Sequence, residues 1–298
     1  MTLSELRFIV AVGREKNFRR AAEKCFVSQP ALSLAIKKLE DELGLALFER
    51  NRSEVTITPA GQLIINQANV VLDEAGKIKE IARQGDSQLT QPFSLGLIYS
   101  IAPYLLPIMI PVLREESPGM PLEVEENITK NLAENLKKGK LDAVIIALPF
   151  DVAGVECIHL YDEPFEVIVP IKHPWAKKTA LSPQEISQEK VMLLDNVHCY
   201  TNQIAEACPG LSENRDVQLG NSLETIRNMV ASNLGISVLP KSATFARYDN
   251  PLVKTISFTD PKPYRRVALA YRKSTVKKQA IDHIVQSIKK ADLKPFTA

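Results

Sequence analysis

The sequence predicts an α/β protein that starts with a small helical domain and continues into a larger domain of alternating strands and helices. Short amphipathic helices followed by a hairpin occupy the first 58 residues, and a long helix with a heptad pattern comes next. Beyond residue 92, strand-like and helix-like segments alternate. With 298 residues, the chain is long enough for two or three domains with real cores.

Helix-capping side chains mark the starts of three short helices near the N-terminus. Thr2 and Glu5 form a capping box ahead of an apolar stripe, Asn17 caps a second helix, and Ser28 caps a third. Pro30 sits in the first turn of the third helix, where its missing amide hydrogen costs nothing. Three helices in succession are therefore expected.

The third helix has two different faces. Gln29, Ser33 and Lys37 recur every four residues on the side away from the core. Amide, hydroxyl and ammonium groups on one exposed face suit base edges and phosphates in the major groove of DNA. An ordinary solvated face is the alternative. The apolar residues of the opposite face are Leu32, Ile36, Leu39 and Leu43.

Residues 47–58 have the pattern of two short strands around a polar turn, which places a wing after the third helix. The formal net charge of +2 is too small to indicate nucleic-acid binding by itself. Basic residues are nevertheless concentrated in residues 14–24 and at the wing tip. The DNA contacts are expected from Gln29, Pro30, Ser33, Lys37, Arg50 and Arg52.

These segments resemble the winged helix-turn-helix of LysR-type transcriptional regulators. The resemblance rests on Phe-Arg-Arg-Ala-Ala-Glu at 18–23, Val-Ser-Gln-Pro-Ala-Leu-Ser at 27–33, Lys-Leu-Glu-Asp-Glu-Leu-Gly at 38–44 and Leu-Phe-Glu-Arg at 47–50. It implies a DNA-binding domain, a linker helix, and a two-lobed α/β effector domain like that of periplasmic binding proteins. It also implies a homodimer or homotetramer on double-stranded promoter DNA, with RNA polymerase as a partner.

The domain boundaries follow from this plan. The winged helix-turn-helix covers 1–58, the dimerisation helix and hinge cover 59–90, and the effector domain covers 91–298. The resemblance divides the effector domain into lobe I, residues 91–161 and 268–298, and lobe II, residues 162–267. The chain is expected to cross between lobes near Tyr161-Asp162 and Val267-Ala268.

The linker helix is expected to begin after a Thr58-Pro59 cap. Its apolar residues follow with heptad spacing, which favours pairing with a second copy of the chain. The alternative is a stripe that packs on its own domain. The residues of this predicted seam are Ile64, Ala68, Val71, Ala75, Ile78 and Ala82.

Strands of the effector domain are predicted at 93–99, 122–126, 143–147 and 165–169. Three predicted strand ends run into hydroxyl residues, Ser100, Thr129 and Ser222, which can cap the helices that follow. Hydroxyl caps beside free helix-start amides suit small polar or anionic ligands, although plain capping explains them equally. The uncharged stretch 87–113 is long enough for a membrane, but its recurring prolines argue against a spanning helix.

Two of the four cysteines, Cys199 and Cys208, lie close together, and His198 precedes the first. A nearby imidazolium stabilises a thiolate. The intervening residues are polar or small and predict a loop or frayed helix, which could let the thiols approach to the roughly 7 Å between Cα atoms that a disulfide needs. The alternatives are two unrelated buried cysteines, or a zinc site that adds His159.

The cysteine pair resembles that of the hydrogen-peroxide-sensing members of the LysR family. This resemblance implies that Cys199 reacts with peroxide and that Cys208 resolves the product as a disulfide. It also implies that Ser100, Thr129, His198 and Arg266 surround Cys199. The protein is then expected to be an activator of antioxidant genes that needs no cofactor and is reset by a thioredoxin- or glutaredoxin-type reductant.

Other functions are compatible with parts of the sequence. A LysR-type regulator that responds to a small metabolite between the lobes is the main alternative. A thiol peroxidase enzyme has no use for a DNA-binding domain. An exported substrate-binding protein is disfavoured because the sequence shows no signal peptide, and a cytoplasmic location is expected.

Overall fold

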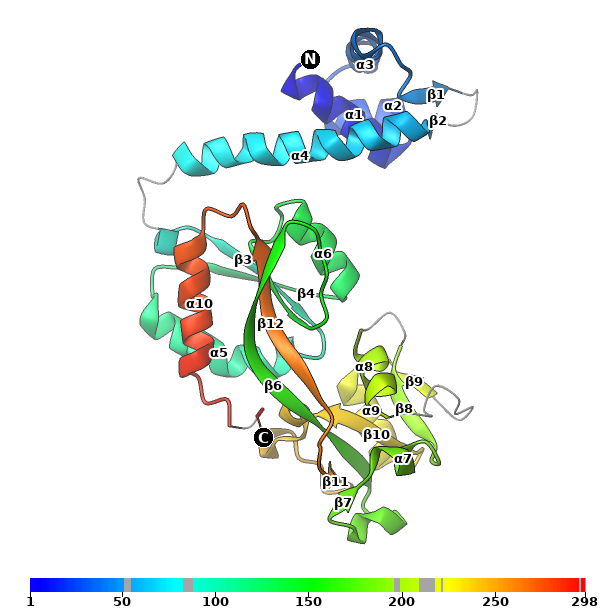
Figure 1. The fold of residues 1–298 in the computed structure, drawn as a ribbon, viewed down its shortest axis with the longest axis vertical. Helices are drawn as coiled ribbons and strands as arrows, with labels where there is room; N and C mark the ends of the chain where they lie inside the picture. The colour runs from blue at the N-terminus through cyan, green and yellow to red at the C-terminus, as the bar shows by residue number, and fades with distance from the viewer. Residues whose placement is uncertain are drawn as a thin grey trace. The chain divides into compact units, whose positions relative to one another are not determined.

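The computed structural model describes residues 1–50, 55–82, 88–195, 199–208, 218–220, 222–294 and 296–297. The chain forms two compact units, Met1–Gly85 and Asp86–Ala298. Each unit has a hydrophobic core of its own. The predicted fold class, a winged helix-turn-helix with a linker helix followed by a two-lobed α/β domain, is confirmed (Figure 1).

The first unit contains the predicted helices and wing. Its elements are α1 (Leu3–Glu15), α2 (Phe18–Lys24), α3 (Gln29–Leu43), β1 (Phe48–Arg50), β2 (Val55–Ile57) and α4 (Pro59–Ala82). Thr2, Asn17 and Ser28 cap the first three helices through their side-chain oxygens, as predicted. The strands β1 and β2 pair antiparallel, which confirms the hairpin after α3.

The linker helix α4 uses part of its apolar surface within its own unit. Thr58 caps it by accepting a hydrogen bond from the Gly61 amide at 2.9 Å. Ala68 is buried in the core of the unit, and Ile64 and Val71 pack against that core. The N-terminal half of the predicted seam is therefore internal, because a heptad pattern alone does not say which partner it faces.

A different apolar stripe of α4 is exposed. Leu63, Val70 and Ile78 are 71%, 51% and 69% exposed, and they are spaced seven and eight residues apart. This spacing keeps them near one line along the helix. Only Ile78 belongs to the predicted seam. Leu63 and Val70 each precede a seam residue by one position, so these exposed side chains are further candidates for contact with a second copy.

The second unit is built on a curved mixed sheet with strand order β4-β3-β5-β12-β6-β10-β8-β9, and β11 joins β6 and β7. The strands are β3 (Phe93–Ile98), β4 (Leu122–Asn127), β5 (Ala143–Ala147), β6 (Val155–Pro170), β7 (Ala180–Leu181), β8 (Val191–Leu194), β9 (Gln218–Gly220), β10 (Ile236–Pro240), β11 (Val253–Phe258) and β12 (Tyr264–Arg272). The helices are α5 (Ala102–Glu116), α6 (Thr129–Lys137), α7 (Pro183–Ile186), α8 (Cys199–Ala207), α9 (Leu223–Ala231) and α10 (Lys278–Lys290). Short 3-10 turns are η1 (Gln88–Thr90), η2 (Pro174–Lys177), η4 (Lys241–Thr244) and η5 (Ala246–Tyr248).

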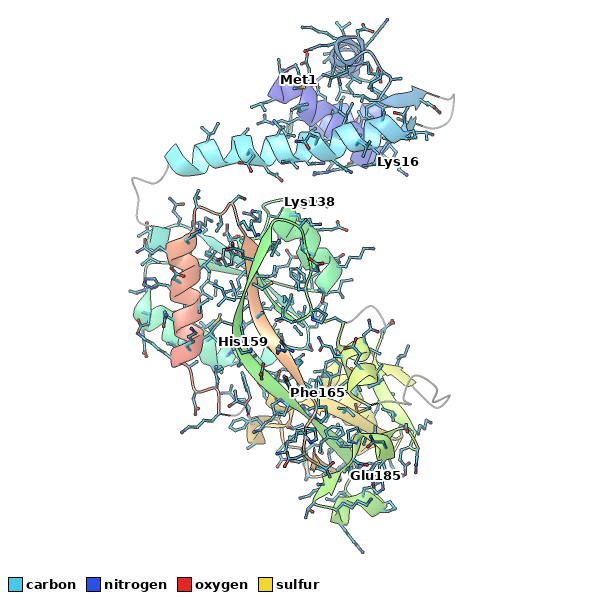
Figure 2. The ribbon with its side chains drawn as sticks, viewed as in Figure 1. Met1, Lys16, Lys138, His159, Phe165 and Glu185 are labelled. Carbon is cyan, nitrogen blue, oxygen red and sulfur yellow. The ribbon has the colours of Figure 1, made fainter. Side chains whose placement is uncertain are left out.

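Two long antiparallel strands, β6 and β12, run through both lobes and join them (Figure 1). The strand β6 is longer than the predicted 165–169 because it continues back into lobe I, where β12 pairs with it. His159 and Phe165 lie on the two sides of the predicted crossing along β6 (Figure 2). The pairing of the two strands slips between Val267 and Ala268. The ladder is thus irregular where the lobes meet.

The helix α5 tolerates prolines that sequence reasoning treated as breakers. Pro107 and Pro111 lie inside it, and both are exposed, as is Pro103. A spacing of four puts the three rings on one face, so that their missing amide hydrogens fall on the solvent side. None of the helices described here is long and apolar enough to cross a membrane.

The exposed stripe of α4 gives a test of self-association. Leu63→Asp combined with Val70→Asp should dissociate a dimer, because both changes place charges in an apolar contact. The melting temperature should stay within a few degrees of wild type, because neither side chain belongs to the core. Light scattering and thermal melts measure the two quantities.

Gln62→Asp, at an exposed polar position one residue away, is the matched control and should leave the molecular mass unchanged. An unchanged mass in the double variant would show that α4 does not pair through this stripe.

Candidate functional site

Ser100 and Thr129 lie at the same edge of the lobe I sheet. They follow the parallel neighbours β3 and β4, whose last residues, Ile98 and Asn127, are register partners. Neither hydroxyl acts as the predicted helix cap, since the N-caps of α5 and α6 are Ile101 and Ile128. Neither hydroxyl is therefore used in capping.

The third predicted cap is real and lies in lobe II. The Ser222 hydroxyl accepts a hydrogen bond from the Thr225 amide at 3.1 Å at the start of α9. A bond of this kind stabilises a helix by about 1 kcal/mol. Plain capping thus explains Ser222.

Arg265 forms a buried ion pair beside Ser100. Its Nε lies 2.8 Å from Oε2 of Glu163, and the two side chains are 1% and 0% exposed. Its terminal nitrogens donate to the Ser100 hydroxyl at 2.7 Å and to the Ser100 carbonyl at 2.8 Å. Burial by itself lowers the pKa of Arg265, but the Glu163 carboxylate together with Tyr161 and Tyr200 outweighs burial, and the net shift is upward. The guanidinium therefore stays charged.

Arg265 was missed in the sequence, where Arg266 was assigned to the site. Arg266 is exposed, and strand alternation points it away from the face that holds Arg265. The sequence signal that could have identified Arg265 is the alternation of side chains along β12, which puts Arg265 on the same face as buried Val267. Arg266 remains a prediction for the site.

The segment that carries the cysteines forms the regular helix α8, although the sequence indicated a loop or frayed helix. Tyr200 anchors it, because its buried hydroxyl donates to the Val238 carbonyl at 2.7 Å. The Thr201 hydroxyl donates to the Leu194 carbonyl at 2.6 Å. The Tyr200 ring also meets Phe165 edge-on and lies 5.7 Å from the Arg265 guanidinium carbon. Tertiary contacts thus hold a segment of weak helical preference.

Cys199 and Cys208 are free thiols at opposite ends of α8. Nine residues of helical rise separate their Cα atoms by about 13 Å, well beyond the roughly 7 Å limit for a disulfide. Cys199 is half-buried, whereas Cys208 is fully buried in the core of lobe II. Burial raises the pKa of Cys208 to about 12. Cys199 is therefore the accessible thiol, and a bond between the two requires α8 to unwind.

Two buried polar atoms lack hydrogen-bond partners in the described structure, the Thr129 hydroxyl and the Gln203 side-chain carbonyl. Gln203 was not predicted as a site residue. It lies one helical turn after Cys199, on the same side of α8. Unpaired buried polar groups are costly and indicate a place for a small hydrogen-bonding molecule. The only sequence signal for Gln203 was its spacing of four from Cys199.

Several predicted residues fall outside what the structure describes. His198 and Arg52 lie outside the described residues. Arg50 ends β1, and its side chain is likewise not described. The described residues hold no group of three or more His, Cys, Asp and Glu side chains that could bind a metal. His159, from the zinc alternative, instead contacts Asp162 at 2.7 Å.

The predicted DNA-contact face is present on α3. Gln29, Pro30 and Lys37 are exposed and Ser33 is half-buried, and the Gln29 amide lies 3.4 Å from the Ser33 hydroxyl. The opposite face is fixed in the core by Leu32, Ile36 and Leu39. One face of α3 is thus free for a groove while the other holds the helix in place.

Each of the two units matches a known protein family. Residues 3–62 match the bacterial regulatory helix-turn-helix protein family, lysR family, and residues 86–292 match the LysR substrate binding domain. The chain belongs to the LysR family of transcriptional regulators.

Within this family, the chain is similar to proteins named for hydrogen peroxide. It is 37% identical over 291 residues to the hydrogen peroxide-inducible genes activator of Haemophilus influenzae, covering 97% of this chain and 96% of that protein. A full-length OxyR variant from Pseudomonas aeruginosa has a TM-score of 0.78 at 45% identity and covers 100% of this chain and 98% of its own. A hydrogen-peroxide-bound OxyR mutant from Corynebacterium glutamicum has a TM-score of 0.67 at 33% identity, with coverage of 99% and 93%.

The α3 face predicts separable effects on DNA binding. Gln29→Ala and Ser33→Ala should each lose about 1–3 kcal/mol of discrimination between an operator and a mutated operator, because base contacts carry sequence choice. Lys37→Ala should weaken binding to both and reduce the salt slope by about one, because phosphate contacts release counterions. Fluorescence anisotropy at several salt concentrations measures these effects. Equal loss of specificity in all three variants contradicts the assignment.

The two thiols should differ strongly in alkylation. With a pKa of about 12, Cys208 remains almost entirely protonated at pH 8, so iodoacetamide should modify Cys199 at least a hundredfold faster, by order of magnitude. Raising the pH to 10 should still leave Cys208 largely unreactive. Peptide mass spectrometry measures both rates, and unfolded protein is the control in which they converge. Comparable rates in the folded protein would show that Cys208 is accessible.

Proposed function

We propose that this protein is a transcriptional regulator that senses hydrogen peroxide through a reversible Cys199-Cys208 disulfide. The observation that carries the proposal is the placement of a half-buried and a fully buried thiol at the two ends of one helix. The names and the structural likeness of the relatives support the same signal. A LysR-type domain plan supports regulation of promoters rather than catalytic turnover.

The proposed reaction consumes one peroxide and two thiols. The Cys199 sulfur attacks one peroxide oxygen, the O–O bond breaks, and the departing hydroxide takes a proton to become water, which leaves a sulfenic acid. The Cys208 sulfur then attacks the Cys199 sulfur, and the S–O bond breaks as the S–S bond forms. The hydroxide that leaves takes the proton of the Cys208 thiol and becomes a second water. Two electrons pass from the thiols to peroxide.

The surrounding groups have defined tasks in this proposal. Hydrogen-bonding groups hold the peroxide in line with Cys199 and stabilise the departing hydroxide, and cations favour the thiolate. Gln203 joins the residues assigned from the sequence because of its unpaired carbonyl. The full set is Ser100, Thr129, His198, Gln203 and Arg266.

Disulfide formation must change the shape of lobe II. The α8 turns between the cysteines have to open, and the bonds from Tyr200 and Thr201 to neighbouring strands then lose their geometry. We propose that this change repacks the contacts between copies of the chain and re-spaces the DNA-binding units on the promoter. A thioredoxin- or glutaredoxin-type reductant restores the thiols.

The remaining partners follow from the family plan. We propose a homodimer through the linker helices and a homotetramer on promoter DNA, in contact with RNA polymerase, with antioxidant genes as targets. DNA binding places this activity in the cytoplasm. The proposal needs no cofactor.

The two cysteines should respond differently to substitution. Cys199→Ser should abolish the reaction with peroxide, whereas Cys208→Ser should still consume one equivalent and stop at sulfenic acid, because only the second step needs Cys208. Dimedone labelling with mass spectrometry detects the trapped acid. Only the wild type should form the disulfide and change its promoter footprint.

Equal reactivity of the two serine variants, or identical footprints of reduced and oxidised wild type, would contradict the proposal. A footprint that changes with a small metabolite under full reductant would instead support a metabolite-responsive regulator.

A further inference from the structure

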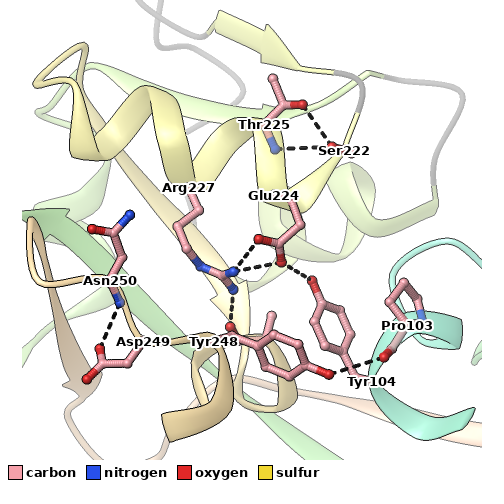
Figure 3. Close-up of polar contacts among 10 residues, drawn as sticks. Pro103, Tyr104, Ser222, Glu224, Thr225, Arg227, Tyr248, Asp249 and Asn250 are labelled. Carbon is pink, nitrogen blue, oxygen red and sulfur yellow. Dashed lines mark hydrogen bonds and ion pairs between the residues drawn. The ribbon is translucent and has the colours of Figure 1, made fainter. Parts of the chain in front are cut away.

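A cluster of aromatic and charged side chains joins the two lobes at the start of α5 (Figure 3). The Tyr104 hydroxyl, on α5 of lobe I, donates to Oε1 of Glu224, on α9 of lobe II, at 3.3 Å. The Tyr248 hydroxyl, from lobe II, donates to the Pro103 carbonyl in lobe I at 3.2 Å. The two tyrosine rings meet edge-on with centroids 5.0 Å apart. Hydrogen bonds thus cross between the lobes in both directions.

The lobe II side of the cluster is held in place by Arg227. Its Nη1 donates to Oε1 of Glu224 at 2.6 Å, and its Nη2 donates to the Ala243 carbonyl. Its guanidinium carbon lies 5.8 Å from the Tyr248 ring centre. Arg227 is buried, whereas the Glu224 side chain is half-exposed. The carboxylate that receives the Tyr104 bond is therefore fixed by an ion pair rather than free to turn.

The same chain segment carries both Ser100 and Tyr104. Ser100 lies in the turn before α5, and Tyr104 lies in the first turn of that helix. One end of the segment is bound by Arg265 and the other by Glu224. Arg265, which binds Ser100, also lies 5.7 Å from the centre of the Tyr200 ring. The same arginine therefore contacts both this segment and the anchor of α8.

The lobes are also connected by β6 and β12, whose pairing is irregular between Val267 and Ala268 at the crossing. Thr129 and Ser100 belong to lobe I, and Cys199 and Gln203 belong to lobe II. A bond between the lobes next to Ser100 limits how far these two sets of groups can separate.

We propose that Tyr104 and Glu224 are positioning residues that latch lobe I to lobe II and so hold the Ser100 and Thr129 hydroxyls at reacting distance from Cys199. This inference rests on the proposed function. Neither residue touches peroxide. The two residues fix the distance across the lobe junction. The rate of an in-line attack depends steeply on that distance.

The test compares two reagents on the full-length reduced protein. Tyr104→Phe keeps the ring contact with Tyr248 but removes the bond to Glu224. It should slow the loss of the Cys199 thiol to hydrogen peroxide by about tenfold, because misplacement of the hydroxyls weakens the transition state. The rate with iodoacetamide should stay within twofold of wild type, since alkylation needs no groups from lobe I. Rapid quenching and peptide mass spectrometry give both rates.

Tyr271→Phe is the matched control, because its hydroxyl bonds to Glu156 within lobe I at 2.8 Å and crosses no junction. It should leave both rates unchanged. Glu224→Ala removes the same bond together with the Arg227 ion pair, so it should slow the peroxide reaction at least as much as Tyr104→Phe does. Adding Tyr104→Phe to Glu224→Ala should cause no further loss, because the bond between the two residues is already absent.

Three results would each overturn the latch while leaving peroxide sensing intact. They are an unchanged peroxide rate in Tyr104→Phe, an equal fall in the rates with peroxide and with iodoacetamide, and additive effects in the double variant. A wild-type protein whose Cys199 ignores peroxide would overturn the proposed function and the latch together.

Discussion

The buried ion pair between Arg265 and Glu163 is the interaction on which the geometry of the effector domain depends. Taking both charges out of water is costly, and removing one partner of such a pair typically destabilises a protein by about 3–5 kcal/mol. Here that cost is offset by the hydrogen bonds that both charged groups make to their neighbours. Arg265 binds Glu163 and both oxygens of Ser100 and lies against the Tyr200 ring, while Glu163 also accepts from the Ser242 amide. One cation thereby ties a turn of lobe I, the hinge and α8 together.

Different kinds of contact determine the structures of the two units. In the DNA-binding unit, short-range contacts decide where helices start, because each helix begins at a side chain that accepts a bond from the amide three residues further on. In the effector domain, distant contacts decide it. The helix α8 persists because Tyr200 reaches a strand 38 residues further along the chain. A segment held in this way can be released by local chemistry without unfolding the rest of the lobe.

This difference explains what the sequence could predict. The caps at Thr2, Asn17 and Ser28 and the strand at 143–147 were predictable, because local bonds and apolar runs determine them. Ser100 and Thr129 were predicted as caps but do not cap helices. The Ser100 hydroxyl accepts a hydrogen bond from Arg265, and the Thr129 hydroxyl has no partner among the described residues.

The other differences have the same origin. The apolar residues of α4 could not be assigned to one partner from the sequence, because a heptad pattern does not distinguish a core from a second copy. Arg265 was overlooked because a buried arginine is identified by its partners rather than by its neighbours in the chain. For the site, the cysteine pair was visible in the sequence, but the helix between the thiols and the buried side-chain carbonyl of Gln203 needed the fold.

The length of α8 has a consequence for the kinetics of the proposed reaction with peroxide. In that proposal, the first oxidation is an encounter between Cys199 and peroxide, and its rate rises in proportion to peroxide concentration. Closure of the disulfide instead waits for the helix to open, because Cys208 stays buried and protonated until then. Opening is a unimolecular event with a rate that concentration does not change. At high dose the switch would therefore run at a fixed maximum rate, with the singly oxidised form accumulating ahead of it.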